Sequence, residues 1–87
     1  MTNKNIKNLE KLKKEFFELQ YNKYKTYAFG DREASIAAAF YLGDMMNEYK
    51  RRTISYSEEY ALGMFKAEID FIKECNMKRK LKSLENQ

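Results

Sequence analysis

The chain has 87 residues, of which 44% are hydrophobic, 15% aromatic and 34% charged, and its formal net charge is +4 at pH 7. This length predicts one helical domain over residues 1–87, with a thin core. Because the chain has no proline and only three glycines, its composition excludes a turn-rich sheet fold, and we expect an all-α protein.

The composition also indicates a compartment. The longest uncharged apolar run, residues 34–43, is about half as long as a bilayer span, and no signal-peptide core precedes it. We therefore expect a cytoplasmic protein with no membrane partner. Cys75 is the only cysteine, so no intrachain disulfide can form, and we expect its thiol to be half-buried. The lysine, asparagine and tyrosine content has the character of short phage or mobile-element proteins.

The first helix is predicted over residues 4–28. Its apolar face carries side chains at alternating spacings of three and four: Leu9, Leu12, Phe16 and Leu19. We expect Gly30 to end this helix in the left-handed conformation, which glycine adopts without strain. Asp31 follows as the predicted N-cap of the next helix, with Ser35 as the alternative.

A second helix is predicted over residues 32–51. Its main stripe passes from small to large side chains: Ala34, Ala38, Leu42, Met45 and Tyr49. Lysine and arginine at residues 50–52 favour a helix end there, because positive charge complements the helix dipole. Thr53 and Ile54 are expected to form the link to the third helix.

A third helix is predicted over residues 56–84. Ser55 and Glu58 have the spacing of a capping box at its start. Its apolar face carries Leu62, Phe65, Ile69 and Ile72. Three helices with short links predict a small antiparallel three-helix bundle, and we expect residues 1–4 and 84–87 to fray.

Enzymatic chemistry is the least favoured function. The chain has no histidine, the usual general base at neutral pH. Two carboxylate pairs have helical spacing, Asp44 with Glu48 and Asp70 with Glu74, but they alternate with lysines as a solvated surface does. We therefore expect no catalytic residue, no metal site, no cofactor and no enzymatic activity.

A protein partner is the favoured prediction. Tyrosine and methionine are plentiful, and both suit interface cores. The second helix is apolar on more than one side, which three helices cannot cover completely. We expect a non-enzymatic adaptor, regulator or inhibitor that forms a homodimer and binds an unidentified protein. Its predicted anchors are Ile36, Phe40, Tyr41 and Tyr49.

Nucleic-acid binding is the alternative. The excess positive charge lies in residues 1–28, which hold seven lysines against three glutamates. Residues 21–27 interleave tyrosine with lysine, a combination suited to bases and phosphates. In an up-down-up bundle, this segment shares one end with the basic cluster 78–82. The candidate residues are Lys7, Lys11, Lys14, Tyr21, Lys23, Tyr24, Lys25, Lys78, Arg79, Lys80 and Lys82.

Overall fold

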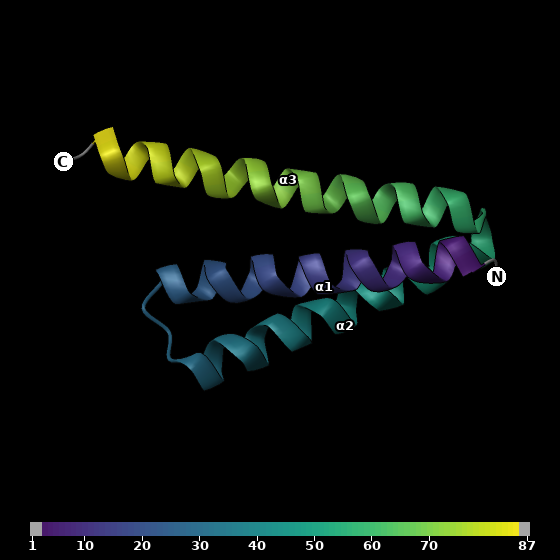
Figure 1. The fold of residues 1–87 in the computed structure, drawn as a ribbon, viewed down its shortest axis with the longest axis horizontal. Coiled ribbons are helices and arrows are strands. Elements are labelled where there is room, and N and C mark those ends of the chain that lie inside the picture. The colour runs from purple at the N-terminus through teal and green to yellow at the C-terminus, as the bar shows by residue number, and fades with distance from the viewer. Residues whose placement is uncertain (1–2, 86–87) are drawn as a thin grey trace.

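The computed structural model describes residues 3–85, without the side chains of residues 83 and 85, and contains three helices. Helix α1 spans Asn3–Thr26, α2 spans Asp31–Ser55 and α3 spans Glu58–Glu85. They run up, down and up, so that α2 is antiparallel to both neighbours (Figure 1). The predicted all-α three-helix bundle is confirmed. Of the ends predicted to fray, residues 3–4 and 84–85 are helical, and residues 1–2 and 86–87 lie outside the described residues.

The turn between α1 and α2 differs from the prediction. Ala28, not Gly30, adopts the left-handed conformation, with φ of 65°. The amide of Phe29 donates to the carbonyl of Tyr24 at 3.2 Å, and the amide of Ala28 donates to Lys25 at 3.0 Å. These two bonds form a Schellman motif, and the Tyr24 and Phe29 rings pack together as that motif favours. The helix thus ends two residues before the predicted position.

Gly30 instead begins the second helix. It occupies the N-cap position of α2 in an extended conformation, with φ of −66°. The prediction of Asp31 as the cap is therefore wrong. Asp31 is the first helical residue, and its carboxylate accepts hydrogen bonds from Lys25 at 2.6 Å and from Tyr21 at 3.0 Å. The carboxylate thus joins α2 to the last turns of α1.

The turn between α2 and α3 is shorter than predicted. Thr53 and Ile54 are helical, and the hydroxyl of Thr53 donates to the carbonyl of Tyr49 at 2.9 Å. Only Tyr56 and Ser57 separate the two helices. Ser57 caps α3, because its hydroxyl accepts a hydrogen bond from the amide of Tyr60 at 3.0 Å. The predicted capping box starting at Ser55 is therefore wrong by two residues.

The core lies at the end of the bundle that contains the α2–α3 turn. Phe65 of α3 is fully buried between Phe16 of α1 and Tyr49 of α2, whose rings contact it edge to face. Ile69 continues this core on α3, and beyond it α3 has no fully buried side chain among its described residues. Figure 1 shows α3 leaning away from α1 and α2 toward its C-terminal end.

The chain has a large surface for its mass. Its accessible area is 6505 Å², with a radius of gyration of 14.7 Å. A compact monomer of this mass exposes about 5,400 Å², and a domain of this length has a radius of gyration of roughly 12 Å. The bundle therefore exposes about 1,100 Å² more than a compact monomer.

Candidate functional site

A groove lies between α2 and α3, with α1 as its floor. It has a volume of about 410 Å³. Phe16 and Gln20 of α1 form the floor, Tyr41 and Met45 belong to the α2 wall, and Phe71, Ile72 and Cys75 belong to the α3 wall. We call this space the partner groove.

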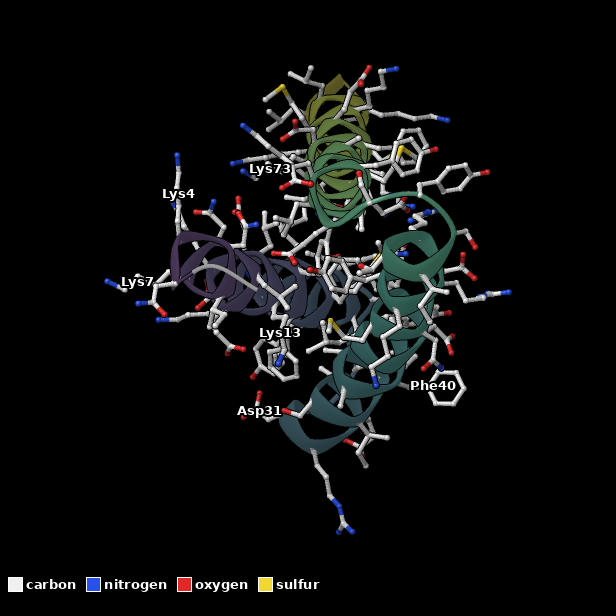
Figure 2. The ribbon with its side chains drawn as sticks, turned by 90° about the vertical axis from the view of Figure 1, so that its right-hand side faces the viewer. Lys4, Lys7, Lys13, Asp31, Phe40 and Lys73 are labelled. Carbon is white, nitrogen blue, oxygen red and sulfur yellow. The ribbon has the colours of Figure 1, made fainter. Side chains whose placement is uncertain are left out.

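Exposed aromatic rings extend the partner groove onto the outer surface of α2. Phe71 on the α3 wall is 60% exposed, and Phe40 beside the α2 wall is 69% exposed. The Phe40 ring contacts Tyr41 edge to face, with centroids 6.2 Å apart. Figure 2 shows Phe40 pointing away from the bundle, on the side of the molecule opposite Lys4 and Lys7. Such a surface is characteristic of protein contact sites.

A second opening lies between the last turn of α1 and the C-terminal part of α3. Its volume is about 610 Å³. Lys23 comes from α1, Tyr27 from the turn that follows it, and Arg79 and Lys80 from α3. We call it the basic cleft, because no acidic residue lines it and none of its three cations forms an ion pair with a described side chain. The positive charge here is available to an anion.

A third opening separates the N-terminal halves of α1 and α3 and differs in charge. Its volume is about 550 Å³. Lysines line it from both helices, at Lys11, Lys66 and Lys73, but Glu15 and Asp70 lie among them. Lys73 forms an ion pair with Glu15 across the two helices, and this contact raises the pKa of Lys73. We call this opening the neutralised cleft.

The structure separates the four predicted partner anchors. Ile36, Phe40 and Tyr41 are exposed on α2. Tyr49 is 3% exposed and lies in the core against Phe65, so it is not available as a surface anchor. Burial raises the pKa of Tyr49. Tyr49 is buried because it continues the stripe of Ala38 and Met45 on the inner side of α2.

Sequence reasoning did not single out Phe71, which lines the partner groove and is exposed. Phe65, Ile69 and Ile72 define the inner face of α3, and Phe71 falls outside their spacing. An aromatic residue out of phase with a helix's core stripe was the available signal.

The predicted nucleic-acid residues fall into three groups. Lys7, Lys11 and Lys14 are exposed on the N-terminal half of α1, away from the basic cleft. Lys23, Arg79 and Lys80 meet in that cleft. The expected proximity of segments 21–27 and 78–82 is confirmed, since the Arg79 guanidinium lies 5.6 Å from the centroid of the Tyr27 ring.

The third group, apart from Lys82, is engaged in contacts within the protein. A hydrogen bond with Tyr41 raises the pKa of Tyr24 to about 12, and their rings stack with centroids 5.9 Å apart. Hydrogen bonds from Lys25 and Tyr21 lower the pKa of Asp31 and raise their own pKa values. On α3, Lys78 pairs with Glu74 at 3.2 Å, and Lys82 is exposed.

Comparison of the chain with family models, curated proteins and solved structures found no match in any of the three. Within residues 3–85, no cluster of three histidine, cysteine or acidic residues could hold a metal ion. None of the helices in the described part of the chain combines the length and apolar character needed to cross a membrane. The partner groove and the basic cleft are the features on which the proposals below rest.

Proposed function

We propose that this protein is a non-enzymatic interaction protein that binds an amphipathic helix of a partner protein in the partner groove. The observation that carries the proposal is the exposed apolar surface along this groove, formed by Phe40, Tyr41 and Phe71. Large aromatic rings are the residue type that most often anchors a protein interface. The partner helix would become the fourth helix of the bundle.

The surface area of the chain supports this occupant. A standard interface buries about 800 Å² on each partner. The bundle exposes about 1,100 Å² more than a compact monomer of its mass, so one helix laid along the groove would restore an ordinary ratio of surface to volume. The groove runs between two antiparallel helices, which is the geometry that a fourth helix fills.

The charges along the groove indicate the chemistry of the partner helix. Asp44 and Glu68 lie on opposite walls and form no ion pair with a described side chain. Lys23 and Arg79 lie at the end where α3 diverges. We therefore expect a partner helix with basic residues near Asp44 and Glu68 and acidic residues near Arg79, because opposite charges fix the direction of binding.

Site-specific photo-crosslinking tests this proposal. A photoreactive phenylalanine replaces Phe71 in one variant and Lys7 in a matched variant, both at exposed positions. We expect one partner protein to be crosslinked at position 71 and not at position 7. The recovered partner, bound to the unmodified chain, should slow alkylation of Cys75, which lines the groove.

The same partner provides the quantitative test. Phe40→Ala and Phe71→Ala should each weaken its binding by about tenfold or more, because anchors of this kind contribute at least 1–2 kcal/mol. Circular dichroism should show an unchanged helix content. Equal crosslinking at both positions, or unchanged affinity in both alanine variants, would contradict the proposal. A crosslinked pair of two copies of this chain, with doubled mass in sedimentation, would assign the groove to self-association instead.

A further inference from the structure

The basic cleft collects positive charge that the rest of the described chain does not neutralise. Lys23 of α1 and Arg79 and Lys80 of α3 line it without an ion-pair partner among the described side chains. Like charges brought together across a cleft repel one another, and a bound anion removes this repulsion. In the neutralised cleft, acidic side chains of the protein itself offset the repulsion, because Glu15 and Asp70 lie among the lysines.

The basic cleft also offers flat surfaces and amide groups. The Tyr27 ring is 47% exposed, and the guanidinium of Arg79 lies over it. Arg79 also donates to the side-chain oxygen of Asn76 at 3.4 Å, so its plane is held from two sides. Asn22 and Asn76 line the cleft and present amide groups. A guanidinium plane supported by an aromatic ring is a stacking surface for a nucleobase.

We infer that the basic cleft binds single-stranded nucleic acid. Lys23 and Lys80 contact phosphates, and the Arg79–Tyr27 pair stacks on a base. This combination of cations with a stacking surface is how proteins bind single strands without reading their sequence. A cleft of about 610 Å³ between two helices accommodates a nucleotide. A duplex keeps the faces of its bases stacked against one another, so it cannot use the stacking surface.

Fluorescence anisotropy with a labelled oligothymidine of about ten nucleotides tests the inference. The cleft variant is Lys23→Gln with Lys80→Gln, and the matched control is Lys11→Gln with Lys66→Gln. Each variant removes one lysine from α1 and one from α3, and none of the four lysines forms an ion pair with a described side chain. Circular dichroism checks that both variants fold.

We expect binding at about 50 mM salt that weakens strongly at about 200 mM. The cleft variant should bind about tenfold more weakly and lose about 1.4 from the slope of log affinity against log salt, because two phosphate contacts are gone. The control should change affinity by less than about twofold. Tyr27→Leu, which keeps every charge, should weaken binding at least about fivefold through lost stacking.

Four outcomes would overturn the inference. These are no binding at the lower salt, equal losses in the cleft and control variants, duplex binding as tight as single-strand binding, and equally effective competition by an acidic peptide. Lys23 and Arg79 line both spaces, whereas Tyr27 lines the basic cleft and not the partner groove, and Phe71 lines the partner groove and not the basic cleft. Tyr27→Leu and Phe71→Ala therefore distinguish a failure of one proposal from a failure of the other.

Discussion

The two halves of the α1–α3 interface use the same pair of helices for different purposes. In the first half, Phe16 packs edge to face against Phe65, with Ile69 in the same core, and the neutralised cleft lies beside this core. In the second half, Lys23 faces Arg79, and the helices diverge around the basic cleft. Both halves are helical, so the difference comes from the residues at the inward positions.

The comparison shows how a small bundle opens a cleft without an added loop or domain. Continuing an apolar stripe keeps two helices in contact, because each buried side chain contributes about 1.5–3 kcal/mol. Where long cations replace that stripe, close packing of the helices is unfavourable, because burying an unpaired charge costs free energy. The helices separate, and the space between them remains lined with groups that can bind a ligand.

The largest expected effect contrasts two phenylalanines on α3. Phe65→Ala in the core should lower the free energy of unfolding by about 3–5 kcal/mol, because it removes a fully buried ring. Phe71→Ala on the partner groove should change it by no more than about 0.5 kcal/mol, because the ring is exposed. Urea denaturation followed by circular dichroism measures both. A loss at Phe71 as large as that at Phe65 would mean that α3 packs closely along its whole length in solution.

An intermediate effect is expected where the two halves meet. Gln20 is 6% exposed, and its side-chain oxygen has no hydrogen-bond partner among the described residues. Gln20→Met keeps the shape and removes the unpartnered oxygen, so it should raise the free energy of unfolding by about 1 kcal/mol. The same denaturation experiment measures this change. A decrease in stability would show instead that the amide makes a bond that holds the boundary in place.

The smallest expected effect depends on pH and concerns the contact between Tyr24 of α1 and Tyr41 of α2. The hydrogen bond with Tyr41 raises the pKa of Tyr24 from 10.0 to about 12. Because the folded state favours protonated Tyr24, this contribution to stability is present below pH 10 and is lost as the pH rises toward 12. Ultraviolet titration of tyrosinate should show one late-titrating group, absent in Tyr24→Phe. Tyr41→Phe should return the pKa of Tyr24 toward 10.0, and an unchanged late titration would exclude the hydrogen bond as its cause.

The helices could be predicted more accurately than their ends. The spacings of Phe16 and Phe65 with their apolar neighbours are sufficient to indicate helices, because they repeat at intervals of three and four residues. The ends depend on competing local bonds. Ala28 takes the left-handed position that glycine favours, since the Schellman bonds to Tyr24 and Lys25 end α1 there. Ser57 caps α3 in place of Ser55, because α2 continues through Ser55.

By itself, the sequence determined three helices, their up-down-up order and the proximity of segments 21–27 and 78–82. These follow from the periodicity of apolar residues and from short links, and both are local properties of the sequence. Only the tertiary structure decided which charges remain available. Lys25 forms an ion pair with Asp31 on α2, whereas Lys23, two residues earlier, lines the basic cleft with Arg79 of α3. The reason is geometric: two residues of helix rotate a side chain by about 200°, and the packing of three helices assigns each direction a different neighbour.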